Sequence, residues 1–298
     1  SRRNDQRINQ ARNLDAVAPR SRHCMTRIIQ ISDPHIVPHG QLAYGQVDTA
    51  KALADCVETI KRSLPEIGPV DMVVVAGDLT DFGTEEEYQR FRSLMEPLDL
   101  PYRAVPGNHD DVTAMRTCFS DQSWMPTEGP INWASDFDDL VVIGLDSSVP
   151  ESAHGHLTDE TLSFLAAKLD AQEGQPTIVT LHHPPVLTGI EKMDIQNLRE
   201  SKELKTILSG YNGELRLTCG HVHRNIVAPF GKVICHIAPG VSHAVTMDLR
   251  ISAPNCLTKE PGGFLLHEMR GGILTHTIPS GHFDGPHLFY PDKTNHQT

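Results

Sequence analysis

The chain of 298 residues has a formal net charge of −12 and contains 39% hydrophobic and only 5% aromatic residues. Its length suits one large domain or two small ones, and no apolar run is long enough to cross a membrane. Because nucleic acids and anionic membranes require a basic surface, we expect neither as a partner. An anionic substrate would need local positive charge, and bound metal ions could supply it.

Residues 1–24 differ from the rest of the chain. They contain six arginines and two aspartates but almost no apolar periodicity. The acidic residues argue against an organelle-targeting segment, and the lack of an apolar stretch argues against a signal peptide. We predict that 1–24 is a disordered leader or a non-native extra segment, and that the functional chain starts at Met25.

The cysteines show no closely spaced pair of the kind that binds metal or forms a redox motif. Two of the six, Cys219 and Cys235, lie inside apolar, strand-like runs. We expect buried free thiols in a reducing compartment, and therefore a cytoplasmic protein.

Short apolar runs rich in Val and Ile recur along the first 221 residues. Each has the length of a strand, and several are apolar on both faces, as strands in the core of a layered fold are. The predicted strands are 27–32, 71–77, 102–107, 140–146, 177–183 and 215–221.

Helical patterns separate these runs at 48–64, 84–98 and 158–169. The second opens with Thr84 followed by Glu87, the spacing of a capping box. Alternation of strands and helices predicts a layered α/β architecture. After about residue 230 the helical patterns end, and four further strands are predicted at 232–238, 244–251, 263–269 and 272–278.

Polar side chains of the kinds that bind metal ions follow five of the apolar runs directly. If the strands are neighbours in parallel sheets, their carboxyl ends lie along one edge, where open α/β folds bind ligands. Gly77, Gly107 and Gly220 would allow tight turns there. The five clusters are Ser32-Asp33-Pro34-His35, Gly77-Asp78-Leu79-Thr80-Asp81, Gly107-Asn108-His109-Asp110, His182-His183-Pro184-Pro185 and Gly220-His221-Val222-His223.

Each cluster alone has an ordinary structural explanation. An Asp-x-His pair occurs often by chance, and an aspartate after glycine is commonly a turn or cap residue. Asp81, Asp110 and His183 stay ambiguous between such roles and support of a site. Five clusters in order, each at a strand end, favour a shared metal centre. Mixed carboxylate, imidazole and amide ligands suit Fe, Mn, Zn or Co better than Ca.

This set of clusters resembles the signature of calcineurin-like metallophosphoesterases, over about residues 27 to 290. Weaker features are similar to bacterial glycerophosphodiesterases and class III cyclic-nucleotide phosphodiesterases: Tyr44-Gly45 with Asp48, Met193-Asp194 after the histidine pair, the stretch 251–256, and Phe283-Asp284-Gly285-Pro286. The resemblance implies a four-layer αββα sandwich over residues 25–298. Within it, 244–298 would form a small β extension and tail used in a dimer or higher homo-oligomer.

The resemblance also implies two divalent metal ions, Fe, Mn, Zn or Co, and no other cofactor. Asp78 would bridge them, since one carboxylate can hold two ions about 3.5–4 Å apart. His109 would protonate the leaving oxygen or stabilise developing charge, or would only orient its neighbours. The implied ligands are Asp33, His35 and His223 for one ion, and Asn108, His182 and His221 for the other; Asn108 would also donate a hydrogen bond to the phosphoryl group.

The expected function is a binuclear-metal phosphodiesterase that hydrolyses small phosphodiesters, with glycerophosphodiesters favoured, by attack of metal-bound hydroxide. A 3′,5′-cyclic-nucleotide phosphodiesterase and a broad-specificity phosphomonoester or phosphonate ester hydrolase are the alternatives within the same chemistry. A non-catalytic scaffold is disfavoured because all seven implied ligands are present. A nuclease is disfavoured because the chain is acidic.

Overall fold

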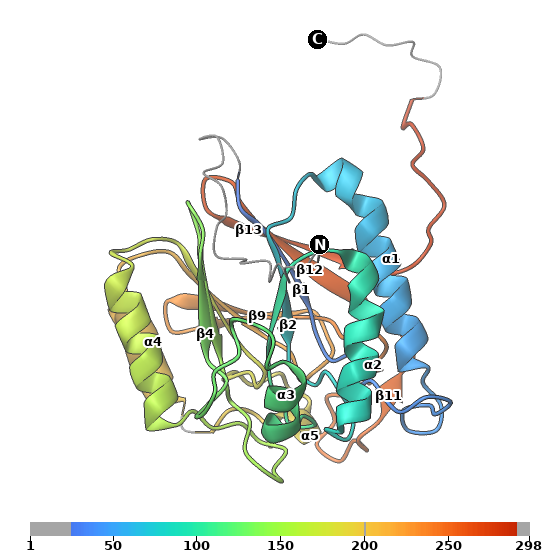
Figure 1. Cartoon of the computed structure of the whole chain (residues 1–298), viewed down its shortest axis with the longest axis horizontal. Helices are drawn as coiled ribbons and strands as arrows, with labels where there is room; N and C mark the ends of the chain where they lie inside the picture. The colour runs from blue at the N-terminus through green and yellow to red at the C-terminus, as the bar shows by residue number, and fades with distance from the viewer. Residues whose placement is uncertain (1–24, 200, 291–298) are drawn as a thin grey trace, which may run out of the picture.

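The computed structural model describes residues 25–199 and 201–290, so the predicted leader 1–24 lies outside the described residues. Two β-sheets pack face to face, and helices cover the outer face of each (Figure 1). This is the four-layer αββα arrangement that the resemblance implied.

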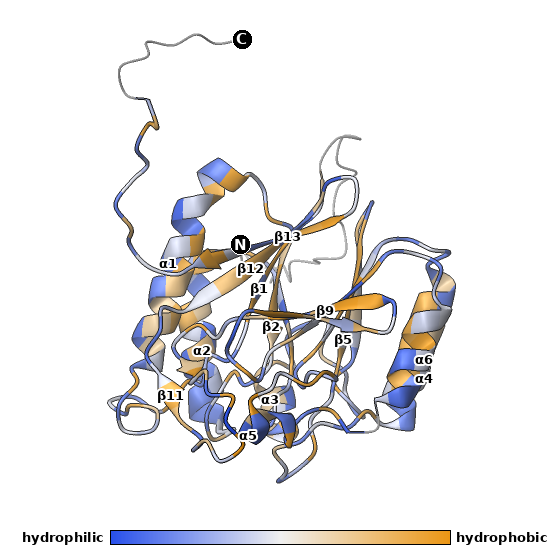
Figure 2. Ribbon diagram, turned by 180° about the vertical axis from the view of Figure 1, so that it is seen from behind, coloured by the Kyte–Doolittle hydropathy of each residue, from blue (hydrophilic) through white to orange (hydrophobic). Residues whose placement is uncertain are grey.

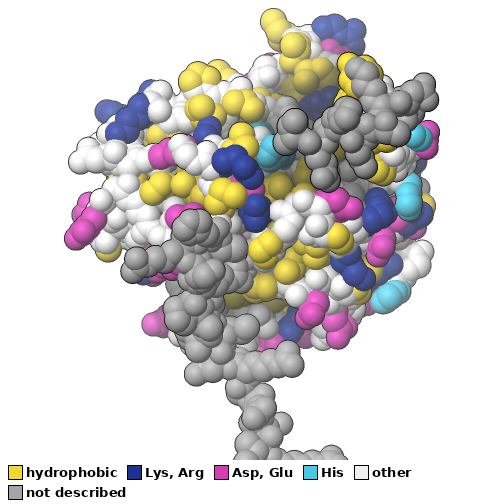
Figure 3. All heavy atoms as spheres, turned by 90° about the horizontal axis from the view of Figure 1, so that it is seen from above, with side chains coloured by type: hydrophobic (Ala, Val, Ile, Leu, Met, Phe, Trp, Pro, Cys, Tyr) yellow, Lys and Arg dark blue, Asp and Glu magenta, His cyan; other side chains and the backbone are white. Residues whose placement is uncertain are grey.

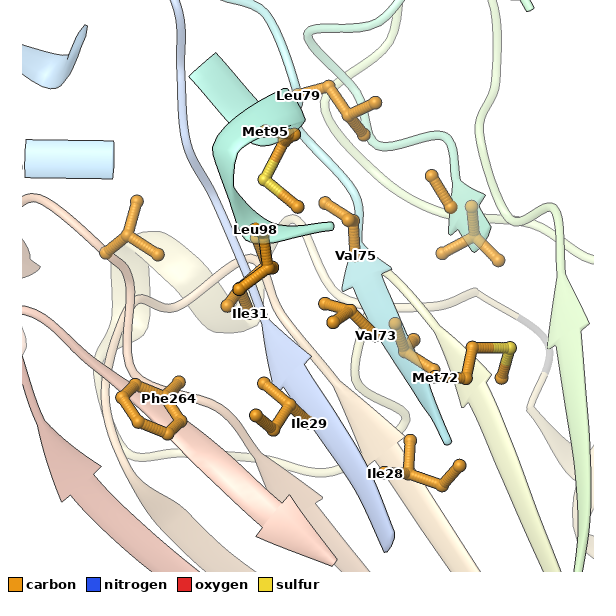
Figure 4. Close-up of a cluster of buried hydrophobic side chains, with 14 of the residues drawn as sticks. Ile28, Ile29, Ile31, Met72, Val73, Val75, Leu79, Met95, Leu98 and Phe264 are labelled. Atoms are coloured by element: carbon orange, nitrogen blue, oxygen red, sulfur yellow. The ribbon is translucent and has the colours of Figure 1, made fainter. Parts of the chain in front are cut away.

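The first sheet has the strand order β13-β12-β1-β2-β3. Its three N-terminal strands are parallel, and β12 pairs with β1 in the antiparallel direction. Ile28, Ile29 and Ile31 of β1 are fully buried and lie beside residues of β2 and Phe264 of β12 (Figure 4). The strands are β1 (Arg27–Ile31), β2 (Met72–Ala76), β3 (Tyr102–Val105), β12 (Gly263–Met269) and β13 (Ile273–Pro279).

The second sheet has the order β4-β5-β6-β7-β9-β8. The four inner strands are parallel, and the two edge strands pair with them antiparallel. Every residue of β5 and β6 is buried, as expected for parallel strands covered on both faces. The strands are β4 (Trp133–Asp136), β5 (Val141–Leu145), β6 (Thr177–Leu181), β7 (Leu215–Cys219), β8 (Ile226–Phe230) and β9 (Val233–Ile237).

The outer helices turn their apolar sides inward and their polar sides to solvent (Figure 2). Helices α1 (Thr49–Ile67) and α2 (Glu85–Met95) pack on the first sheet, and α4 (Asp159–Ala171) and α6 (Lys202–Gly210) on the second. The predicted capping box is present at α2, where Thr84 and Glu87 bond reciprocally. The shorter helices are η1 (Glu96–Leu98), α3 (Val112–Cys118) and α5 (Glu191–Asp194).

The six predicted N-terminal strands and three predicted helices are confirmed, with ends that agree or differ by at most three residues. The predicted strand 244–251 is wrong beyond Val245: β10 (Ala244–Val245) pairs with β11 (Leu257–Thr258), and the chain between them turns where Asp248 accepts the backbone N–H of Arg250. Residues 263–279 contribute β12 and β13 to the first sheet, where β12 pairs with β1, while the use of 244–298 as an extension stays a prediction.

The end of the molecule opposite α3, α5 and β11 carries both signs of charge. On the face visible in Figure 3, Lys and Arg are interspersed with Asp and Glu and with apolar side chains. In the described part of the chain, no helix combines the length and the apolar character that a membrane span requires.

Candidate metal centre

The predicted ligand residues lie just beyond the carboxyl ends of five parallel strands from both sheets. Asp33 and His35 follow β1, Asp78 follows β2, and Asn108 follows β3. From the second sheet, His182 follows β6, and His221 and His223 follow β7. The structure brings all seven to one edge of the sandwich.

All three predicted glycines are required for this convergence; a Cβ atom on Gly220 would lie 2.1 Å from Oγ of Ser32. A Cβ atom on Gly77 would lie 2.3 Å from Nδ1 of His182, and one on Gly107 would lie 2.2 Å from Oδ1 of Asp78. All three distances are far inside van der Waals contact. At Gly77 only a hydrogen atom lets the two sheets approach, and at Gly107 only a hydrogen atom lets the neighbouring strand ends of the first sheet approach.

The backbone at the strand ends adopts the left-handed conformation at residues that are not glycine. The φ angles are +56° at Asp33, +46° at His35, +50° at Asp78, +73° at His221 and +54° at His223. Such conformations cost about 1–3 kcal/mol each and cluster at functional sites. Here the left-handed conformations bring the side chains of these five residues together at one edge of the sandwich.

The first group of ligand atoms contains Asp33, His35 and His223. Nε2 of His223 lies 3.3 Å from Oδ1 of Asp33 and 3.2 Å from Nε2 of His35. Nε2 of His35 also lies 3.5 Å from Oδ2 of Asp78.

The second group contains His182, His221 and Asn108. Nε2 of His182 lies 3.2 Å from Oδ1 of Asn108 and 3.3 Å from Nδ1 of His221. The same nitrogen lies 3.2 Å from Oδ2 of Asp78. That carboxylate oxygen is therefore shared by both groups, as a bridging ligand must be.

The spacing and burial of these atoms fit two metal ions. Atoms bound to one ion at about 2.1 Å lie roughly 3.0–3.4 Å apart, depending on coordination geometry. His35 and His182 turn their lone pairs inward, because each uses Nδ1 in a hydrogen bond elsewhere: to Asp81 Oδ1 at 3.0 Å and to the Ala76 carbonyl at 2.8 Å. All these histidines and aspartates are buried.

The electrostatics of the group also favour bound cations. Burial alone would raise the pKa of Asp33 and Asp78, but the neighbouring imidazoles, His223 and His182 respectively, hold both pKa values below the usual range. Two ionised, buried carboxylates next to four imidazole rings form a donor set that suits divalent transition ions.

The structure resolves two of the ambiguous aspartates. Asp81 bonds His35 and so orients a ligand-type imidazole. Asp110 instead accepts the backbone N–H groups of Leu79 and Gly107 and the hydroxyl of Tyr88. Its role is to hold the two strand-end loops together.

His109 lies at the border between the buried group and the cavity, with 34% of its side chain exposed. Its backbone N–H donates to Oδ1 of Asp78 at 2.8 Å, and its Nδ1–H donates to the carbonyl of Asp81 at 2.9 Å. This tautomer leaves Nε2 for a ligand. Burial lowers the pKa of His109, but the charges of Asp78 and Asp81 outweigh it and raise the pKa overall.

His183, which was ambiguous from sequence, already has a hydrogen-bond partner outside the ligand groups. Its Nδ1 pairs with the hydroxyl of Ser147 at 2.8 Å. One ring nitrogen of His183 lies within 4.8 Å of a ring nitrogen of His182 and of one of His221. Its ring packs against both, at centroid distances of 4.8 Å. We therefore do not add it to the predicted ligands.

A cavity of about 260 Å³ opens onto the convergent side chains. Several of its residues were missed in the sequence because they lie in irregular segments without a strand-end motif. His243, for example, packs against His223 with ring centroids 4.5 Å apart. The lining comprises His35, Tyr44, Asp78, Asn108, His109, Met193, Gln196, His221, His223, His243, Val245, Asn255, Cys256 and Leu257.

Comparison with known proteins agrees with this geometry. The family model described as calcineurin-like phosphoesterase matches residues 26–225. The chain belongs to the calcineurin-like phosphoesterase family. Members of this family bind a dimetal centre, and the buried histidine and aspartate groups fit one.

Two similar proteins of known sequence cover most of the chain. A probable glycerophosphodiester phosphodiesterase GpdQ of Arcobacter nitrofigilis is 38% identical over 269 residues, 89% of this chain and 97% of that relative. A cAMP/cGMP dual specificity phosphodiesterase of Mycobacterium tuberculosis is 30% identical over 260 residues, 85% of this chain and 79% of that relative.

Two solved structures show the same fold at low sequence identity. A dimetal phosphatase from Danio rerio superposes with a TM-score of 0.57 at 13% identity, over 86% of this chain and 99% of that one. A purple acid phosphatase from yellow lupin gives 0.59 at 14% identity, over 86% and 52%. This member of the calcineurin-like family is a metal-dependent phosphoesterase.

Proposed function

We propose that this phosphoesterase hydrolyses small phosphodiesters, with glycerophosphodiesters as the favoured substrates. The observation that carries the proposal is the position of Asp78, whose Oδ2 lies within 3.5 Å of ring nitrogens from both ligand groups at the base of an open cavity. One ion would be held by Asp33, His35 and His223, the other by Asn108, His182 and His221, with Asp78 between them.

Two divalent ions bound there would supply Lewis acidity, which lowers the pKa of water and offsets charge on phosphoryl oxygens. Fe, Mn, Zn or Co fit these donors. The protein provides the geometry: Asp81 and the Ala76 carbonyl fix the rings of His35 and His182. The side-chain amide of Asn108, which lines the cavity, can donate a hydrogen bond to a phosphoryl oxygen.

Hydrolysis adds water across one P–O bond, and the departing alkoxide takes up a proton. His109 is placed to provide it from Nε2 of the protonated ring, because its Nδ1–H is fixed on the Asp81 carbonyl and its ring lines the cavity. The raised pKa of this ring favours the protonated form that a general acid requires.

The substrate preference rests on the most similar of the two sequences described above, which is named a probable glycerophosphodiester phosphodiesterase. The second candidate is a 3′,5′-cyclic nucleotide, and the 30% identity to a cAMP/cGMP phosphodiesterase favours it. Both substrates are small phosphodiesters, so the same residues would perform the same bond cleavage on either.

Elemental analysis and turnover together test the proposal. The purified protein supplied with Mn, Zn or Fe should contain close to two ions per chain, and it should hydrolyse glycerophosphoethanolamine faster than 3′,5′-cyclic AMP or a simple phosphomonoester. Dominant turnover of cyclic AMP would replace the favoured substrate by the second candidate. Comparable efficiency on all three would contradict a narrow specificity.

We further infer a cytoplasmic protein that forms a dimer or higher homo-oligomer through residues 244–298. The described cysteines support a reducing compartment: all are free, and the Sγ atoms of Cys219 and Cys235 remain 3.9 Å apart. The test is the molar mass in solution, measured by light scattering. It compares the full chain with a variant substituted at the exposed Leu249 and Ile251.

A further inference from the structure

Two residues with carboxamide side chains, Gln196 and Asn255, line the cavity together with the ligand residues. We propose that this pair determines substrate specificity, by hydrogen bonding to an arm of the phosphodiester that is neutral and bears hydroxyl groups. The inference rests on the proposed phosphodiesterase function and specifies which arm the cavity accepts.

Gln196 is presented by the segment 187–197, in which the side chains of Thr188, Asp194 and Asn197 bond within the segment or to its base. The carboxylate of Asp194 accepts N–H and hydroxyl donors from Thr188, both at 2.7 Å, and the N–H of Gly189 at 2.9 Å. Asn197 donates to the carbonyl of Val186 at 2.7 Å. These bonds fix the segment and leave the carboxamide of Gln196 for a ligand.

Asn255 is presented by the β10–β11 ribbon, which is tied to the candidate metal centre. Arg224 directly follows His223, and its guanidinium donates to both carboxylate oxygens of Glu260, at 3.0 and 2.9 Å. It also donates to the carbonyl of Val245 at 2.6 Å. One arginine therefore sets the position of this ribbon relative to a ligand-type histidine.

The two carboxamides have unused hydrogen-bonding capacity. In 25–199 and 201–290, neither side chain makes a hydrogen bond to another protein group. Each offers donors on nitrogen and an acceptor on oxygen, and a hydroxyl group needs one of each. Two carboxamides in one cavity lining suit an arm with neighbouring hydroxyls, such as a glyceryl group.

The described lining of the cavity offers no counter-charge to an arm that is itself charged. Among the described residues that line it, none is a lysine or arginine, so an arm with a second phosphate finds no cation beyond the metal centre. The one carboxylate is Asp78, whose side chain is 3% exposed and faces the ligand group, so an ammonium arm finds no counter-ion. Tyr44 is the one Phe, Tyr or Trp side chain among the described lining residues, and one such ring does not form a cage for a quaternary ammonium.

The experiment uses the metal-loaded protein and phosphodiesters with a constant p-nitrophenyl leaving group. The second arm is glyceryl, ethyl or choline, and kcat/KM is measured for each. We expect glyceryl to exceed ethyl by about two- to tenfold, the range for one or two net hydrogen bonds between neutral groups. We expect choline to be the poorest of the three.

The variants Gln196→Leu and Asn255→Leu should each lower the glyceryl-to-ethyl ratio, mainly through KM. Gln196→Glu should raise the choline-to-glyceryl ratio, because it introduces the missing counter-ion. Gln89→Leu, an exposed glutamine of α2, is the matched control and should keep the wild-type ratio and turnover.

Equal efficiency with glyceryl and ethyl arms, or ratios that do not move in the Gln196 and Asn255 variants, would overturn the inference while leaving a working phosphodiesterase. Absence of hydrolysis of all three diesters by protein that contains its metal ions would instead overturn the proposed function.

Discussion

Buried histidines occur at two places in this fold, and their surroundings differ. At the carboxyl edge of the strands, the rings of His35, His182 and His223 turn nitrogens toward one another and toward carboxylates at 3.2–3.5 Å. Between the sheets, His267 of β12 is equally buried, at 1% exposure, but each of its nitrogens has its own hydrogen-bond partner.

The His267 network can be assigned atom by atom. Gln30 donates its amide N–H to the carbonyl of Cys219, which leaves its oxygen to accept from Nε2–H of His267 at 3.1 Å. The hydroxyl of Thr275 then donates to Nδ1 at 2.9 Å. A neutral ring satisfies all of these bonds, so this histidine needs no ion.

The comparison shows that burial alone does not mark a functional histidine. At the carboxyl edge of the strands, several lone pairs face one another, and there are too few protons for all of these atoms to form hydrogen bonds. The predictions below test the two environments. They remove the charge of Asp78, the ring of His109, the space beside Gly107 and the titration of His267.

The largest effect is expected from Asp78→Asn, which removes the charge shared by both ligand groups. We expect the bound metal to fall well below two ions per chain and turnover to fall roughly a thousandfold or more, as when an essential transition-state contact is lost. Elemental analysis and initial rates measure both. Asp138→Asn, at an exposed aspartate, is the control and should change neither; full metal content in Asp78→Asn would contradict the shared-ligand assignment.

His109→Ala should slow turnover by about ten- to ten-thousandfold while both ions stay bound. Because a general acid matters most for a basic leaving group, the loss should be larger for a glycerophosphodiester than for a p-nitrophenyl diester. Rates on the two substrates, with metal content measured in parallel, provide the test. An equal loss on both would assign His109 a structural role only.

Gly107→Ala should displace Asp78, because the new Cβ would lie 2.2 Å from its Oδ1. We expect weaker metal binding and a decrease of about 1–3 kcal/mol in the free energy of unfolding. Gly210→Ala in α6 is the matched control, since its Cβ would meet no atom within 4 Å. Urea titrations of both variants measure the difference, and equal stability of the two would refute the close approach.

The smallest effect concerns His267, whose pKa burial lowers from 6.5 to about 3, with further lowering by His236 and Arg216. The unfolded chain therefore binds a proton at a higher pH than the folded chain does. This contribution to stability is complete above pH 6.5 and is lost as the pH falls toward 3, by at most about 1.4 kcal/mol per pH unit.

His267→Gln removes this titration, so the free energy of unfolding should depend less steeply on pH between 6.5 and 5 in the variant than in the wild type. The difference between the two chains cancels the contributions of all other groups. Parallel slopes in urea titrations across this range would show that His267 titrates alike in the folded and unfolded states.

The strand ends and the polar clusters that follow them were predictable from sequence because both depend on local patterns; the assignment of seven of these residues as ligands came from the family resemblance and stays a prediction. Apolar runs end abruptly in polar residues, and parallel strands place those ends on one edge. The pattern could not give the left-handed backbone at Asp33 and Asp78, which residues other than glycine rarely adopt. It also could not give the roles of Asp81 and Asp110, because Asp81 bonds His35 and Asp110 bonds Leu79, partners that only folding brings near.

The cavity wall was not predictable for a related reason. Gln196 and Asn255 lie in irregular segments whose shapes depend on bonds such as Arg224 to Glu260, between residues 36 positions apart. The predicted strand 244–251 failed in the same region, where apolar residues such as Leu249 and Ile251 are exposed instead of paired.

The left-handed strand ends link the stability of this protein to its metal supply. Five residues at the ligand cluster hold a conformation that disfavours the folded state, and two like-charged carboxylates lie buried among them. Ions that bind only the folded chain would offset this unfavourable free energy by mass action. The melting temperature would then rise with ion concentration. We expect protein stripped of its ions to melt at a lower temperature than the same protein supplied with them.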